Sequence, residues 1–138
     1  MKSEIKKRFR GYIFSRPFME ERVPQHVQNI VIRDYCTKQG IQYLLSATEY
    51  AMENSALTLR QLVKDLSSID GIVAYSIFQM PEDDNERQSI FNSVLSLKKE
   101  LHFAVEGLSI YDNETYNHIE NIWKVKKTLP HCESLEIL

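Results

Sequence analysis

Short apolar runs alternate with amphipathic helical patterns along almost the whole chain. Four runs rich in β-branched and aromatic residues predict strands at 11–14, 41–45, 72–77 and 101–105. Apolar residues that recur at helical spacing predict helices at 24–39, 58–66, 84–97 and 113–123. Strands joined by helices pair in parallel through right-handed crossovers. The order therefore predicts a three-layer α/β fold, with a short parallel sheet and helices on both faces.

The ends of the predicted helices carry specific signals. Pro24 suits the first position of the first helix, and Gly40 supplies its stop. Thr58 resembles the N-cap of the second helix, because Gln61 lies three residues later and completes a capping box. The caps of the later helices are expected at Asp84 or Asn85 and at Asp112 or Asn113.

The length of 138 residues fits one domain. We expect a core at 10–127 and a tail at 128–138, with Pro130 closing the ordered part. Residues 46–56 have weak periodicity and are expected to form a long loop or broken turn. The third apolar run lacks alternation, as expected of a strand that is covered on both faces.

Charge and cysteine content narrow the function classes. The net charge of −2 gives no sign of a nucleic-acid binder driven by bulk charge, and the basic residues at 6–10 are expected to lead, solvated, into the first strand. Cys36 and Cys132 make a poor disulfide framework. Without a signal-peptide pattern or a membrane-length apolar run, a cytoplasmic protein is expected. The four histidines have no ligand spacing, so we expect no metal site and no cofactor.

Ligands of parallel sheets bind outside the carboxyl ends of the strands. The segment from Ser15 to His26 lies at that edge and is the densest polar segment of the chain. Arg16 and Arg22 offer guanidinium groups, and the start of the first helix favours an anion. We therefore expect one cleft that binds an anion. Its ligand-binding residues are expected to be Arg16, Arg22, Gln25, Glu49, Tyr50 and Gln79.

Three residues at this edge are candidates for catalysis. Glu106 directly follows the fourth apolar run, where burial can raise the pKa of a carboxyl to suit a general acid or base. His26 is the second acid–base candidate. Ser15 is a candidate nucleophile, which would need a base beside it.

Long strings of the chain, at 11–19, 22–29, 32–36 and 44–54, resemble the sporadic carbohydrate cluster protein family. Genes of that family lie in bacterial clusters for biosynthesis of surface polysaccharide, such as lipopolysaccharide or capsule. The resemblance implies a pathway and leaves the reaction open.

Residues 11 to about 110 also resemble the catalytic domain of serine recombinases of the resolvase/invertase type. This resemblance implies a sheet order of 2-1-3-4. In the family's first strand an arginine stands where this chain has Phe14, and the nucleophilic serine where it has Arg16, with Ser15 one position away. The third strand here leads into 78–82 without the family's arginines. The resemblance therefore carries over the fold and no recombinase residue, and we expect no specific DNA binding.

Two functions of different class follow, and DNA recombination is the third alternative. The first is a small cytoplasmic enzyme of surface-carbohydrate biosynthesis that acts on a sugar, a sugar nucleotide or a sugar acid. The second is a non-catalytic partner that binds or scaffolds a biosynthetic enzyme. An anionic sugar or sugar nucleotide is the expected ligand, and no membrane insertion is expected. The last helix carries apolar residues beyond what a small sheet needs, so a homo-oligomer formed through it is also expected.

Overall fold

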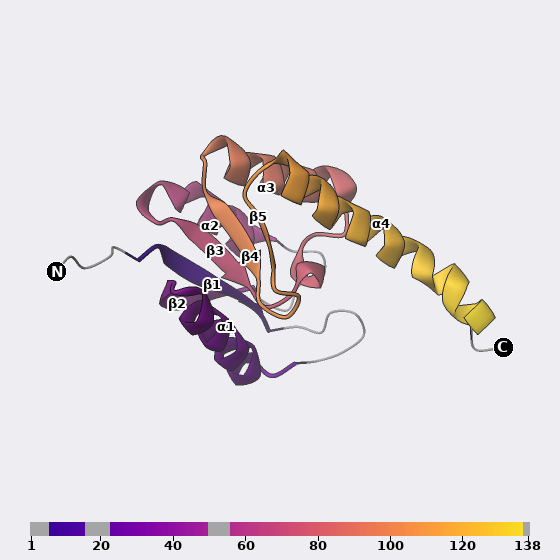
Figure 1. The fold of residues 1–138 in the computed structure, drawn as a ribbon, viewed down its shortest axis with the longest axis horizontal. Helices are drawn as coiled ribbons and strands as arrows, with labels where there is room; N and C mark the ends of the chain where they lie inside the picture. The colour runs from indigo at the N-terminus through magenta and orange to yellow at the C-terminus, as the bar shows by residue number, and fades with distance from the viewer. Residues whose placement is uncertain (1–5, 16–22, 50–55, 137–138) are drawn as a thin grey trace.

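The computed structural model describes residues 6–15, 23–49 and 56–136. Figure 1 shows a sheet with helices packed on both of its faces. The strands are β1 (Arg8–Phe14), β2 (Gln42–Glu49), β3 (Gly71–Ala74), β4 (Glu100–Phe103) and β5 (Leu108–Ile110). The helices are α1 (Gln25–Gln39), α2 (Leu57–Lys64), α3 (Asp84–Ser96) and α4 (Asn113–Glu136), with short 3-10 turns η1 (Leu66–Ser68) and η2 (Ile77–Gln79).

The strands lie in the order β2-β1-β3-β4-β5. The first three pairings of this row are parallel, which confirms the predicted order 2-1-3-4. β5 was not predicted, and it pairs with β4 antiparallel. It is too short to leave a periodic signal, and it returns beside β4 after a tight turn in which Gly107 has a φ of 68°.

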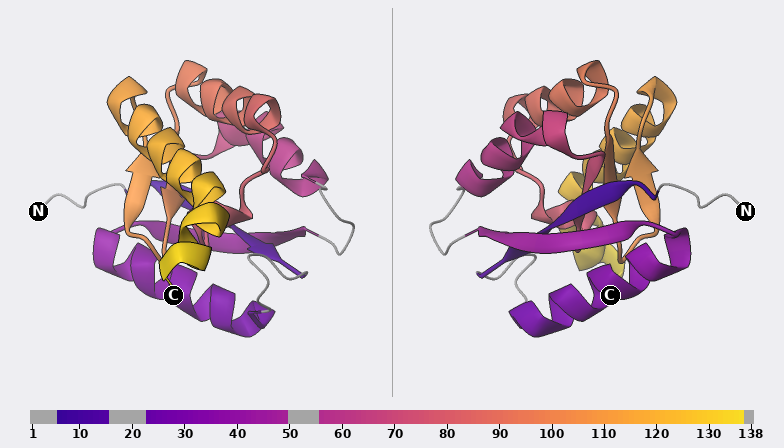
Figure 2. Two further views of the ribbon diagram at one scale, coloured as in Figure 1. Left: turned by 90° about the vertical axis from the view of Figure 1, so that its right-hand side faces the viewer. Right: turned by 90° about the vertical axis from the view of Figure 1, so that its left-hand side faces the viewer.

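Figure 2 shows helices on both sides of the sheet, and an apolar layer lies between the sheet and the helices on each side. α1 covers one face, where Ile32 and Cys36 pack against Phe9, Ile13 and Val73. α2, α3 and α4 share the larger layer on the opposite face. This layer buries Tyr12, Leu59, Leu62, Ile72, Phe91, Phe103, Ile119 and Trp123, among others. Burial of these side chains is the main favourable contribution to the stability of the domain.

β2 is longer than predicted, because residues 46–49 continue the strand instead of starting a loop. The pairing register between β1 and β2 shifts by one residue after Arg10, so that Leu45 is a bulge. Gly11 makes the continued pairing feasible, since a Cβ at this position would lie 2.1 Å from Ser46 Oγ. A bulge of this kind is hard to foresee because it breaks the alternation of the strand.

β3 ends at Ala74, three residues before the predicted end at Ile77. Ser76 is the N-cap of η2 and forms a capping box with Gln79, which draws the chain out of the sheet. β4 also ends earlier than predicted, at Phe103. Both strands are therefore short, and the polar residues that follow them lie at the carboxyl edge of the sheet.

The predicted helix caps are partly wrong. Thr58 lies inside α2, whose N-cap is Ala56, so the predicted capping box at Thr58 does not form. Asp83, not Asp84 or Asn85, caps α3, and Pro24 is the N-cap of α1 rather than its first residue. Asp112 does cap α4, accepting the Thr115 N–H at 2.9 Å.

α4 continues through Pro130 to Glu136, past the predicted end of the ordered part. Proline removes one hydrogen bond from a helix, and that loss does not end this one. In Figure 1 the last turns of α4 extend well beyond the sheet.

Lys98, just after α3, has a φ of 59°, which is left-handed backbone. A side chain in this region costs about 1–2 kcal/mol, whereas glycine adopts it freely at a smaller entropic cost. We expect Lys98→Gly to raise the free energy of unfolding by about 0.5–1 kcal/mol in urea denaturation. Lys99→Gly is the matched control and should lower it. A lower stability for Lys98→Gly would show that the turn carries no strain.

Candidate functional site

The carboxyl ends of β1, β3 and β4 meet the start of α1 at one edge of the sheet. Gln28 and Gln79, both buried, join these elements. The Gln28 side chain donates to the carbonyls of Phe14 (3.0 Å) and Val23 (2.8 Å), and it accepts the Phe14 N–H at 2.9 Å. It therefore fixes the end of β1 to the first turns of α1.

Gln79 continues this network toward β3. Its Nε2 donates to Gln28 Oε1 at 2.8 Å, and its Oε1 accepts the Tyr75 N–H at 3.0 Å. Each of these contacts satisfies a polar group that would otherwise be buried without a partner. Gln79 was predicted to bind a ligand, and here its amide ties the end of β3 to the end of β1.

Glu106 lies in the turn between β4 and β5, at the edge where it was predicted. Its carboxylate accepts the hydroxyl of Ser76 at 2.7 Å and the N–H of Ile77 at 3.0 Å. It thereby joins the β4–β5 turn to η2. A general acid or base at this position would have to give up one of these bonds.

Glu49, the last residue of β2, is 1 % exposed. Its carboxylate accepts the Tyr12 hydroxyl at 2.8 Å, the Thr58 N–H at 3.1 Å and the Leu59 N–H at 3.3 Å. The free N–H groups and the dipole of a helix start favour a carboxylate there. Glu49 is thus the capping group of α2, supplied from a strand, which local sequence patterns do not reveal.

Ser15 follows β1 and is partly buried, with its hydroxyl donating to the Glu49 carbonyl at 3.0 Å. Gln25 and His26 are exposed in the first turn of α1. Arg16, Arg22 and Tyr50 lie outside the described residues. The structure thus brings Ser15 and Glu49 together, and Gln79 and Glu106 meet through the residues of η2. The anion cleft and its catalytic residues stay a prediction.

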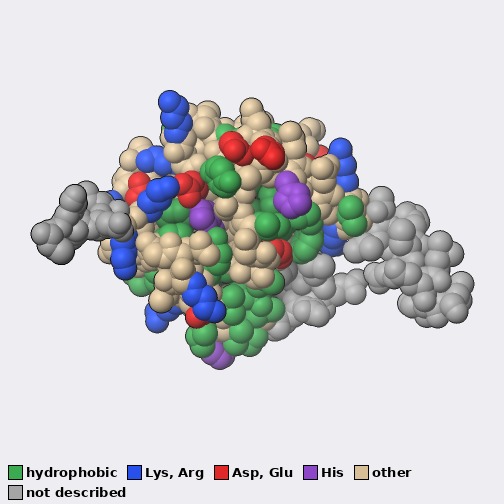
Figure 3. Space-filling model, viewed as in Figure 1, with side chains coloured by type: hydrophobic (Ala, Val, Ile, Leu, Met, Phe, Trp, Pro, Cys, Tyr) green, Lys and Arg blue, Asp and Glu red, His purple; other side chains and the backbone are tan. Residues whose placement is uncertain are grey.

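The loop after β3 is acidic. Residues 75–86 contain no lysine or arginine and include Glu82, Asp83 and Asp84. Phosphoryl transfer depends on cations that stabilise charge in the transition state. On the face shown in Figure 3, basic and acidic side chains are interspersed over the described surface.

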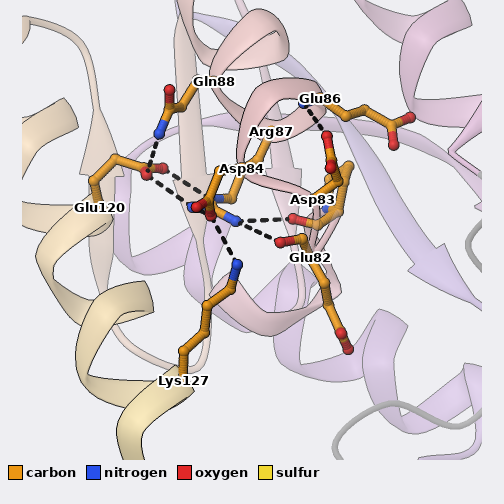
Figure 4. Close-up of polar contacts among 9 residues, drawn as sticks. Glu82, Asp83, Asp84, Glu86, Arg87, Gln88, Glu120 and Lys127 are labelled. Atoms are coloured by element: carbon orange, nitrogen blue, oxygen red, sulfur yellow. Dashed lines mark hydrogen bonds and ion pairs between the residues drawn. The ribbon is translucent and has the colours of Figure 1, made fainter.

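Arg87 follows this loop, and it is 1 % exposed. Figure 4 shows its guanidinium between α3 and α4. It makes two 2.8 Å bonds to Glu120, another to Asp84, and it lies 4.6 Å from the ring centroid of Trp123. Burial opposes charge on both partners, but their ion pair outweighs it, raising the pKa of Arg87 and lowering that of Glu120. Arg87 thus anchors α4 and is not available to a ligand.

A second polar cluster lies on the α1 side of the sheet. Glu100 bonds to His102 at 2.8 Å and to Lys7 at 2.5 Å, and His102 bonds to the Tyr35 hydroxyl at 2.6 Å. The hydrogen bond from His102, followed by that from Lys7, lowers the pKa of Glu100 from 4.5 to about 2. Spacing in sequence did not indicate this cluster, because its residues come from three separate segments.

The lowered pKa of Glu100 predicts an acid-sensitive contribution to stability. It is fully present above pH 4.5 and is lost as the pH falls toward 2, since the unfolded state then binds the proton first. We expect Glu100→Gln to destabilise the protein by about 2 kcal/mol at pH 7. Chemical denaturation of both proteins between about pH 2 and pH 7 should show this difference shrinking on acidification. A constant difference would contradict the assignment.

Among the described residues, no group of three or more histidine, cysteine, aspartate or glutamate side chains is placed to hold a metal ion. Across the same part of the chain, no helix is long and apolar enough to cross a bilayer.

Comparison with solved structures finds proteins of similar fold. The solved structure of the N-terminal catalytic domain of TP901-1 integrase is similar over 90% of this chain and 98% of that chain, with a TM-score of 0.57 and 12% identity. This likeness confirms the resolvase-like fold. No family model and no curated protein sequence matches the chain.

The expected role in surface-carbohydrate biosynthesis is wrong. It rested on resemblance to the sporadic carbohydrate cluster family, which no sequence match supports. The structural match is instead to the catalytic domain of an integrase, and at 12% identity this match shows a shared fold. Of the two sequence resemblances, only the one concerning the fold holds.

Proposed function

We propose that this chain is a resolvase-fold domain that acts by association with a second copy of itself and does not cleave DNA. The absence of DNA cleavage is supported by how the polar side chains at the carboxyl edge of the sheet are bonded. There the described polar side chains Gln28, Glu49, Gln79 and Glu106 are bonded to the fold itself. A phosphate docked beside η2 would meet carboxylates, and the nearest following arginine, Arg87, is bound to Glu120.

α4 supports association. It is anchored to α3 by Arg87 and to the core by Ile119 and Trp123. Beyond this anchor the helix continues for several turns away from the sheet (Figure 1). Isolated helical turns are marginal in water, so a projecting helix gains stability by packing on another molecule. A two-fold pair of projecting helices is the simplest closed arrangement.

Sedimentation equilibrium of the full chain at tens of micromolar tests the proposal. We expect a dimer, and a chain that ends at Lys127 should sediment as a folded monomer, because it keeps the bond from Lys127 to Asp84. A full chain that stays monomeric would refute association.

DNA strand transfer is the second candidate. It is favoured by the likeness to the TP901-1 integrase catalytic domain and by the hydroxyl of Ser15 at the end of β1. Incubation with nicked and intact duplexes, followed by denaturing electrophoresis, would reveal a covalent protein–DNA adduct. We expect none. An adduct that disappears in Ser15→Ala would replace the non-cleaving proposal.

A further inference from the structure

Tyr35, His102 and Glu100 form a continuous hydrogen-bonded chain between α1 and β4. The Tyr35 hydroxyl lies 2.6 Å from His102 Nδ1, and His102 Nε2 lies 2.8 Å from Glu100 Oε1. His102 is 9 % exposed, and the Phe9 ring lies nearly perpendicular to its imidazole, with the ring centroids 4.8 Å apart. Packing therefore holds the imidazole in one orientation.

The partners of His102 fix where its proton lies. A carboxylate only accepts hydrogen bonds, and the low pKa of Glu100 keeps it ionised. Nε2 of a neutral His102 therefore carries the hydrogen, and Nδ1 accepts the Tyr35 O–H. A hydroxyl, a base and an orienting carboxylate in this order are the parts of an activated nucleophile.

The chain of three residues lies beside an accessible part of the sheet. α1 packs on β1 and β2, whereas α3 and α4 pack against β4 and β5 from the opposite face. Figure 3 shows histidine, acidic and basic side chains together on the face over β4 and β5. Tyr35 itself is partly exposed, and the bond from its hydroxyl to His102 is partly buried.

We propose that Tyr35 is a nucleophile that accepts an acyl group from an activated ester, with His102 as its base and Glu100 as a positioning residue. Tyr35 Oη would form a bond to the carbonyl carbon while its proton passes to His102 Nδ1. The bond from that carbon to the ester oxygen then breaks, and the departing oxygen takes the proton. This activity is separate from the association proposed above, and neither depends on the other.

Tyr111 provides an internal control. It is 56 % exposed, and its hydroxyl makes no hydrogen bond within the described part of the chain. Burial raises the pKa of Tyr35 to about 12, so without assistance Tyr35 should react more slowly than Tyr111. Faster reaction at Tyr35 therefore requires the base.

To test the proposal, the full chain is exposed briefly to p-nitrophenyl acetate and the reaction is quenched with acid. Peptide mass spectrometry then measures how much each tyrosine has been acetylated. We expect Tyr35 to be acetylated at least tenfold faster than Tyr111. His102→Gln should abolish this preference while leaving the rate at Tyr111 unchanged. Circular dichroism would show whether that variant is folded.

The acetylation rates of Tyr35 and Tyr111 in the unaltered protein test the proposal even if His102→Gln unfolds. Tyr35 reacting no faster than Tyr111 would overturn the proposal and leave the three residues a structural contact.

The positioning role of Glu100 is tested by the pH profile of acetylation at Tyr35. Tyr35 and Glu100 bond to His102; Cys36 and Glu100 act on the charge of Tyr35, and Glu100 and Asp70 act on that of Lys7. Glu100→Gln should shift the profile to lower pH, and an unchanged profile would refute that role.

Discussion

Replacing Arg87 by alanine is expected to lower the free energy of unfolding by about 3–5 kcal/mol. The substitution leaves the carboxylate of Glu120, which is 9 % exposed, without its bidentate partner. It also removes the cation over the Trp123 ring, 4.6 Å from its centroid. Urea denaturation monitored by the fluorescence of Trp123, the one tryptophan of the chain, reports the change at the site itself.

Arg60→Ala is the matched control for Arg87→Ala. Arg60 also pairs with a glutamate, Glu86, but its side chain is 52% exposed. An exposed pair contributes about 0–1 kcal/mol. If the two variants lose equal stability, the buried pair does not anchor α4. A combined Arg87→Met and Glu120→Leu variant should lose less than Arg87→Ala, because it leaves no unpaired charge.

Glu49→Ala is expected to lower the free energy of unfolding by about 3 kcal/mol. It removes the carboxylate that accepts from the buried hydroxyl of Tyr12 and from the N–H groups of Thr58 and Leu59. Each buried group left unsatisfied costs about 1–3 kcal/mol, part of which water can relieve at the helix start. Thermal denaturation followed by circular dichroism measures the loss.

Glu49→Gln separates hydrogen bonding from charge. Its amide keeps one acceptor oxygen for Tyr12 or for the start of α2, so it should lose about half as much stability as Glu49→Ala. Equal losses in the two variants would mean that the negative charge at the helix start supplies most of the stabilisation.

The sequence predicts the order of elements well because burial imposes a period on each of them. The structure confirms the predicted strands around Ile13, Val73 and Phe103, the helices between them and the sheet order. The errors lie where a long-range contact overrides the local signal. Thr58 has the local features of an N-cap, but it is the carboxylate of Glu49, at the end of β2, that accepts the Thr58 N–H and caps α2.

The polar residues at the carboxyl edge also depend on long-range contacts that local sequence patterns do not reveal. Position along the chain placed Gln79 and Glu106 at this edge, and the structure agrees. Position along the chain does not show that Ser76 bonds to Glu106 or that Gln28 bonds to Gln79. No local pattern marks Arg87 as a site residue, because its partner Glu120 lies 33 positions away. Contacts of this kind depend on how the helices pack, which no local pattern encodes.

The bulge at Leu45 has a consequence for how the protein behaves at high concentration. β2 is an outer strand, and outer strands present backbone groups on which a foreign strand can add. At Leu45 the regular spacing of those groups is broken, and the Leu45 carbonyl already accepts Arg10 Nε at 3.0 Å. An incoming strand therefore cannot continue the ladder past the middle of β2. The same irregularity that lets β1 and β2 pair at Gly11 should protect the chain against growth into fibrils.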